Sequence, residues 1–118
     1  MNILKNVIFV LLLPAIISCG SGPTSTSEMR SIFPKTNYIS SESAKEVAMC
    51  ITEKLENREY GDVKMHPTEE GYIIIVEMAG QIEFLADIKD EETGSSTNFY
   101  ENSWKTKRYF DKKVLSCQ

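Results

Sequence analysis

The chain contains 118 residues, of which 17 are acidic and 13 are Lys or Arg, giving a net charge of −4. This length suits one domain with a small hydrophobic core, which a covalent cross-link would help to stabilise. The acidic balance argues against nucleic acid as a partner, because phosphate backbones are bound by positively charged surfaces.

The N-terminal segment has the order of a secretion signal. A single cation, Lys5, precedes an apolar run from Val7 to Ile17, which is shorter than the roughly 20 residues of a transmembrane helix. The run ends in Ile16-Ile17-Ser18-Cys19, which resembles the lipobox of bacterial lipoproteins. This resemblance implies that residues 1–18 are removed as a signal peptide. It also implies that the thiol of Cys19 is acylated, for example with palmitate, and anchors the chain in a membrane.

The residues after Cys19 are small and polar, which is typical of a flexible tether. In lipoproteins, acidic residues at this point often mark retention in the inner membrane. Gly20 and Ser21 are not acidic, so the resemblance implies an outer-membrane anchor that faces the periplasm. The alternative is that Cys19 merely follows an ordinary cleaved signal. We predict a tether and lead-in segment over residues 19–39 and a single domain over residues 40–118.

An amphipathic helix is predicted at the start of this domain. Ser40 and Ser41 are candidate caps, and the helix is expected to end near Arg58. Between them, apolar residues recur with helical spacing. These residues are Ala44, Val47, Ala48, Ile51 and Leu55.

Short β-strands are predicted to follow the helix. Residues 63–66 form a brief candidate ended by Pro67, and residues 72–78 give the strongest signal, with β-branched and aromatic side chains. Residues 81–89 alternate in polarity, residues 90–96 form a polar hairpin loop, and residues 97–102 are a fourth strand candidate. Residues 104–117 favour a helix, with a strand as the alternative.

The order and spacing of these elements predict an α+β fold. The expected architecture is an N-terminal amphipathic helix packed on a short four-stranded antiparallel meander, with a C-terminal helical segment, in two layers.

The cysteines divide into one lipid site and one pair. If Cys19 carries the lipid, Cys50 and Cys117 are left as an even pair in an oxidising compartment. We therefore predict a disulfide between Cys50 and Cys117, with two buried free thiols as the alternative.

Catalytic and metal-binding patterns are weak. The single histidine, His66, directly precedes Pro67 and has no nucleophile pattern beside it in sequence. Too few soft ligands remain for zinc, and the acidic loop residues lack the spacing of a calcium site. These loop residues are Asp87, Asp90, Glu91 and Glu92. We expect no catalytic residues, no metal and no cofactor.

A surface for a protein partner is predicted from apolar residues on the side of the sheet that should be polar. Three aromatic residues in and after the last predicted strand are natural anchors for such a surface. The proposed residues are Ile73, Ile75, Leu85, Tyr100, Trp104 and Tyr109. The alternative is that the lead-in segment or the C-terminal helix covers these side chains.

Signal, lipobox, tether and a small cysteine-linked domain together resemble small outer-membrane or prophage-type lipoproteins. We expect a non-enzymatic, periplasm-facing lipoprotein that binds an envelope protein or other macromolecule as an inhibitor, immunity or exclusion factor. The alternative is a structural accessory subunit of an outer-membrane or secretion assembly. The sequence leaves the oligomeric state open.

Overall fold

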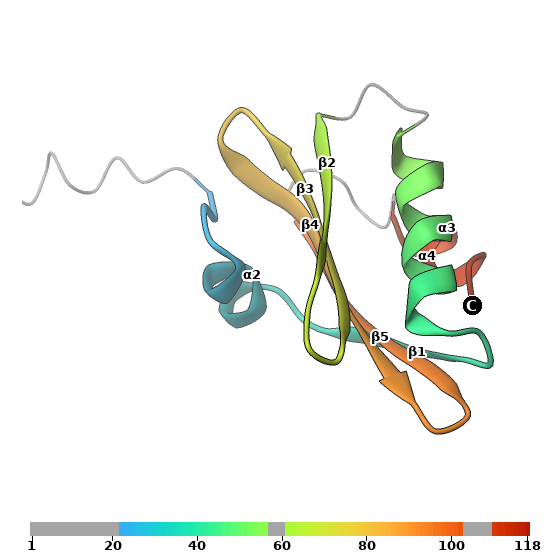
Figure 1. Cartoon of the computed structure of the whole chain (residues 1–118). Helices are drawn as coiled ribbons and strands as arrows, with labels where there is room; N and C mark the ends of the chain where they lie inside the picture. Colours follow the sequence, from blue (N-terminus) through green and yellow to red (C-terminus); the bar gives the residue numbers. More distant parts are fainter. Residues whose placement is uncertain (1–21, 57–60, 103–109) are drawn as a thin grey trace, which may run out of the picture.

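The computed structural model describes residues 22–56, 61–102 and 110–118. Its helices and strands are shown in Figure 1. In chain order they are α2 (Thr26–Ile32), β1 (Thr36–Ser40), α3 (Ala44–Glu56), β2 (Asp62–Pro67), β3 (Gly71–Met78), β4 (Gln81–Glu91), β5 (Gly94–Glu101) and α4 (Asp111–Leu115).

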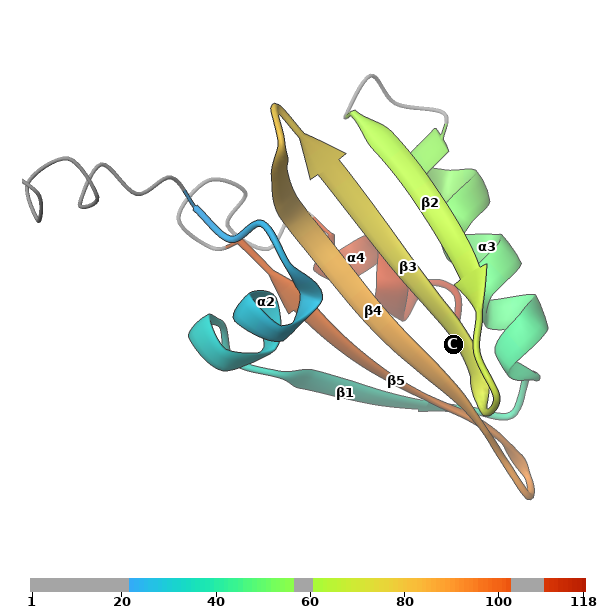
Figure 2. The ribbon, with the colours of Figure 1, turned by 60° about the vertical axis from the view of Figure 1, so that its left-hand side comes forward.

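The strands form one antiparallel sheet in the order β1-β5-β4-β3-β2 (Figure 2). The β3–β4 hairpin turns at Ala79 and Gly80, whose φ angles are 52° and 78°. Positive φ at both central residues matches the right-handed twist of paired strands. At the β4–β5 turn, a Cβ on Gly94 would lie 2.0 Å from the Ser40 carbonyl oxygen. Glycine there lets this hairpin approach the end of β1.

The main core lies between the sheet and α3. The apolar stripe of α3 is fully buried against β-branched and aromatic side chains of the sheet. The C-terminal segment closes one side of this core with Phe110 and Val114. In the sheet, the facing residues include Ile74, Val76, Phe84, Ala86, Ile88 and Phe99. Burial of this stripe supplies most of the helix stability, since short helices are marginal in water.

The N-terminus of α3 is capped by two side chains. The Ser43 Oγ accepts a hydrogen bond from the Glu46 N–H at 3.2 Å, and the Asp90 Oδ1 accepts one from the Ala44 N–H at 2.9 Å. The predicted caps Ser40 and Ser41 are therefore replaced by Ser43 and by an acidic residue of β4, whose charge suits this end of a helix.

The fold predicted from the sequence, an N-terminal helix on a four-stranded antiparallel meander, is wrong. The sheet has five strands, because β1 pairs with β5 and extends the sheet at its edge. A helix, α2, precedes β1, and the predicted helix α3 follows both. The two-layer arrangement is also wrong, since α2 covers one sheet face while α3 and α4 cover the other (Figure 1). α2 and most of β1 thus lie within the predicted tether and lead-in segment of residues 19–39.

The C-terminal helix is shorter than the predicted range of residues 104–117. It spans Asp111–Leu115, with Phe110 at its N-cap position, and residues 103–109 lie outside the described residues.

Candidate functional site

The sheet face turned away from α3, here called the outer face, carries the predicted partner surface. Strand register places Ile73 opposite Asp87, and Ile75 opposite Leu85. Leu85 in turn lies opposite Tyr100. Because paired residues of antiparallel strands project to the same side, all of these side chains share the outer face.

Helix α2 lies on the outer face, over β4 and β5 (Figure 2). Its N-cap is Ser25, whose Oγ accepts a hydrogen bond from the Glu28 N–H at 3.2 Å. Met29 is fully buried and Phe33 is 5% exposed, and the two pack with Ile82, Leu85 and Tyr100 in a second apolar cluster. The i, i+4 spacing of Met29 and Phe33 points both side chains at the sheet.

The predicted partner surface is therefore covered where it is most apolar. Leu85 is fully buried and Tyr100 is 8% exposed, while Ile73 and Ile75 are half-buried at the margin of the cluster. This corrects the prediction that Leu85 and Tyr100 form an exposed surface. The lead-in segment covers them, as the alternative interpretation stated. Trp104 and Tyr109, like the lipidation candidate Cys19, lie outside the described residues.

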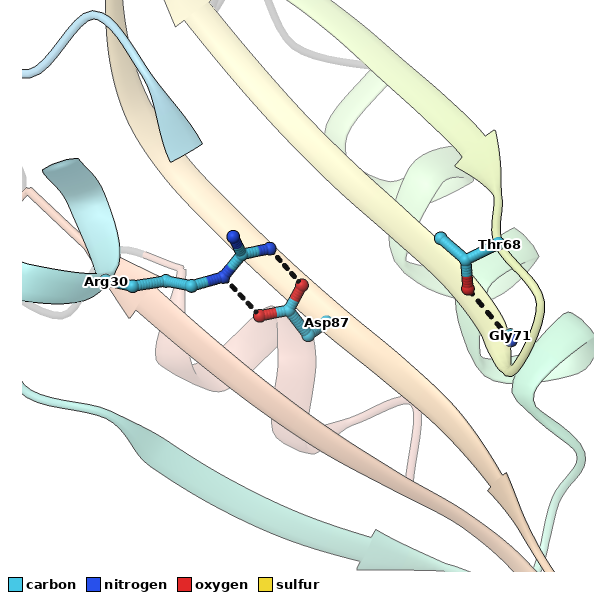
Figure 3. Close-up of polar contacts among 4 residues, drawn as sticks. All are labelled: Arg30, Thr68, Gly71 and Asp87. Carbon is cyan, nitrogen blue, oxygen red and sulfur yellow. Dashed lines mark hydrogen bonds and ion pairs between the residues drawn. The ribbon is translucent and has the colours of Figure 1, made fainter. Parts of the chain in front are cut away.

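An ion pair fixes α2 to the sheet (Figure 3). The Arg30 Nε and Nη2 atoms donate to the two carboxylate oxygens of Asp87 at 3.0 and 2.7 Å. This hydrogen bonding raises the pKa of Arg30 above its ordinary value. Burial under the helix raises the pKa of the Tyr100 phenol, and the nearby Asp87 charge adds to that effect. The pair orients α2 because a two-point Arg–carboxylate contact has one geometry.

A pocket of about 310 Å³ opens between Arg30 and the turn that joins β2 to β3. The Thr68 Oγ accepts from the Gly71 N–H at 3.0 Å and closes that turn (Figure 3). Lys89 and Glu70 form an exposed ion pair at 3.6 Å on the pocket rim. The lining residues are Arg30, Thr68, Glu70, Tyr72, Ile73, Asp87, Ile88, Lys89 and Asn98. Charges of both signs around the half-buried Ile73 side chain suit the binding of a polypeptide segment.

Other predicted residues have structural roles or lie apart. His66 is exposed on β2, opposite Ile73. Asp87 and Asp90, predicted to belong to an acidic loop, lie in β4, where Asp87 binds Arg30 and Asp90 caps α3. Among residues 22–56, 61–102 and 110–118, no three His, Cys, Asp or Glu side chains cluster as metal ligands would.

The Sγ atoms of Cys50 and Cys117 are 2.05 Å apart, which is the distance of a disulfide bond. The predicted pairing is thus present and joins α3 to the segment after α4. Cys117 is 7% exposed and belongs to the main core.

Comparison with known proteins gives no match to a family model, a curated protein or a solved structure. In the part of the chain that the structure describes, none of the helices has the length and apolar character needed to cross a membrane.

Removal of the Arg30–Asp87 pair should loosen α2 without unfolding the sheet. Both side chains are about one-third exposed, so for Asp87→Asn we expect a loss of about 1 kcal/mol or less from the docking of α2. Hydrogen exchange at the Phe33 amide, which donates to the Met29 carbonyl oxygen, would measure this change. Glu77→Gln is the matched control, because the exposed pair of Glu77 with Lys64 lies away from α2. Equal exchange in both variants would contradict the assigned role.

Proposed function

We propose that the chain is a lipid-anchored, non-enzymatic protein of the bacterial cell envelope. Its domain faces the periplasm and binds another envelope protein or macromolecule, as an inhibitor, immunity or exclusion factor. The observation that carries this proposal is the segment Ile16-Ile17-Ser18-Cys19, placed directly before the folded residues. The Cys50–Cys117 pair at disulfide distance supports an oxidising compartment.

The length of the tether limits where such a partner can lie. The Pro23 carbonyl oxygen accepts a hydrogen bond from the Ile82 N–H at 2.9 Å, so the chain is held to the sheet from residue 23 onward. Only three residues separate this point from the proposed lipid site at Cys19, and an extended chain covers at most about 3.5 Å per residue. An acylated Cys19 would keep the domain within about 15 Å of the bilayer surface.

The outer face supports binding near that surface. The helix that carries the chain from the tether onto the sheet lies on this face, and the pocket beside Arg30 opens there. Ile73 offers an apolar contact, and Lys89 and Glu70 offer charges at the rim. A partner that presents an extended polar segment close to the membrane fits this arrangement.

Palmitate labelling tests the anchor. Labelled palmitate should be incorporated into the full-length chain in cells and should be absent from Cys19→Ala. The folded domain lies outside this segment, so Cys50→Ala/Cys117→Ala serves as the control and should keep the label if the chain is secreted. Persistent labelling of Cys19→Ala would show that the lipid is attached elsewhere, and lack of label on the unsubstituted chain would contradict the anchor.

Copurification on the lipid-anchored chain tests the binding role and its alternative. A transient partner that is a hydrolase or toxin supports the inhibitor reading, whereas a stoichiometric envelope complex supports an accessory subunit. Lys89→Glu at the pocket should weaken capture, and Lys45→Glu on the exposed side of α3 should not. Equal capture by both variants would remove the pocket from the proposed interface.

A further inference from the structure

The pocket beside α2 and the docking of that helix depend on the same ion pair. Arg30 and Asp87 both line the pocket, and their two hydrogen bonds, of 3.0 and 2.7 Å, fix α2 to the sheet (Figure 3). The pair is open to solvent, because the side chains of Arg30 and Asp87 are 37% and 29% exposed. A group that enters the pocket therefore meets the contact that orients α2.

Arg30 has more capacity for a ligand than Asp87 has. Among the described residues, Arg30 donates from Nε and Nη2 to Asp87, and a guanidinium has further N–H donors on its two Nη atoms. Asp87 already accepts with both of its oxygens. The two-point contact also fixes the orientation of the guanidinium, which lowers the entropic cost of binding another acceptor. Arg30 is thus oriented to bind a second carboxylate.

The charge of the pocket depends on whether α2 is docked. In the described part of the chain, the lining contains two basic and two acidic side chains, Arg30, Lys89, Glu70 and Asp87. Lys89 and Glu70 form an ion pair with each other at 3.6 Å. Because Arg30 belongs to α2, undocking of the helix removes one basic side chain and leaves the Asp87 carboxylate in the lining. The open pocket is then acidic and repels an anion that the docked state attracts.

The structure of α2 depends on its contact with the sheet. The helix has seven residues, and a helix of this length is marginal in water without tertiary packing. Met29 and Phe33 provide apolar contacts, and Arg30 directly follows Met29 in sequence. Since these contacts come from one short segment, we expect the apolar packing and the ion pair to form and separate together.

We propose that the pocket binds a carboxylate side chain of a polypeptide partner through Arg30, and that α2 is a gate for this site. The carboxylate binds while α2 is docked, and release of α2 removes Arg30 and leaves a pocket that repels anions. Binding and docking are therefore linked, and each strengthens the other by the same factor. This gate regulates the pocket of the proposed function and rests on that function for the partner being an envelope protein.

Tethered charges of opposite sign test this link without a partner. Asn98 lines the pocket and lies directly opposite Asp87, so Asn98→Cys places a thiol beside the ion pair. Methanethiosulfonate reagents then attach a carboxyethyl or an aminoethyl group at high effective concentration. The carboxylate should be attracted to Arg30 only while α2 is docked, and the ammonium group should compete with Arg30 for Asp87. At low ionic strength, we expect exchange at the Phe33 amide to be about threefold slower with the carboxyethyl group.

Two control variants isolate the contact and the position. In Arg30→Gln/Asn98→Cys, α2 brings no cation to the pocket, so the two attached groups should give equal exchange at the Phe33 amide. Met49→Cys should also give equal exchange, because Met49 is 53% exposed on α3, which covers the opposite face of the sheet. This variant also controls for reaction of the reagents at Cys19, which all of the variants retain.

Ile73→Cys is a second attachment point, which keeps the test valid if Asn98→Cys disturbs the sheet. Ile73 lies opposite Asp87 on β3 and lines the pocket, so the same order of exchange rates is expected. Equal exchange with the two groups, or slower exchange with the aminoethyl group, would overturn the gate. A difference that persists in Arg30→Gln/Asn98→Cys would overturn it too. These samples need neither partner nor lipid, so their outcome is separate from the palmitate and copurification tests of the proposed function.

Discussion

Loss of the Cys50–Cys117 link should lower the free energy of unfolding by about 4 kcal/mol. The two residues are 67 positions apart, and closing a loop of that length restricts the unfolded chain by about this amount. A small domain has only about 5–15 kcal/mol of stability, so the reduced protein should be close to its unfolding threshold. Urea denaturation of the oxidised chain and of Cys50→Ala/Cys117→Ala measures the difference.

Reduction supplies the control for this prediction. A reducing agent should shift the urea midpoint of the unsubstituted chain toward that of the double variant, and should leave the double variant unchanged. If the oxidised and reduced chains unfold at the same urea concentration, the link contributes no stability. The packing of Phe110 and Val114 in the main core would then be enough to hold the C-terminal segment against α3.

Shortening Met29 should release α2 from the sheet. Met29 is fully buried beneath the helix, and replacement of a buried Met by Ala costs about 2–5 kcal/mol. For Met29→Ala we expect exchange at the Phe33 amide to accelerate at least tenfold, since about 1.4 kcal/mol corresponds to that factor. Binding of a hydrophobic dye should rise as Leu85 and Tyr100 become exposed.

The same helix supplies the control variant. Ile32 is 44% exposed, so Ile32→Ala should change the exchange rate and dye binding little. The strands of the sheet should keep their exchange protection in both variants, because α2 packs on one face of the sheet, mainly over β4 and β5, while α3 and the main core hold the other face. Global unfolding of Met29→Ala would contradict local docking and would make α2 part of the cooperative core.

The elements that were predicted correctly have a recognisable pattern of side chains within one short stretch of sequence. The β-branched run from Tyr72 to Met78 and the alternation after Gln81 correspond to β3 and β4. The apolar stripe of α3 is buried as its helical spacing predicted. Each of these patterns is visible without knowledge of distant partners.

Two elements were missed for different physical reasons. β1 is five residues long, and its partner β5 lies about 60 positions later, so only the pairing identifies it. α2 is short and begins in Ser/Thr-rich sequence that is typical of a linker. A local signal was nevertheless present, since Ser25 followed by Glu28 is the start of a capping box.

The candidate site was predicted only in part, because its contacts join residues that are distant in sequence. The sequence indicates the apolar excess at Ile73, Ile75 and Leu85, and cover by the lead-in segment is one of the two interpretations that it allows. It does not identify Met29 as part of that cover. The Arg30–Asp87 pair joins residues 57 positions apart, so no local sequence pattern predicts it.

The position of the disulfide determines how the molecule responds to tension along its length. The covalent path toward Gln118 runs from α2 through β1 to Cys50 and then crosses directly to Cys117. Strands β2–β5 lie inside the closed loop, so a pull between the two ends cannot lengthen them. Force applied at the N-terminal side first loads the hydrogen bond between Pro23 and Ile82, and then α2. A pull on this side would therefore uncover the outer face while the disulfide loop still holds β2–β5 together.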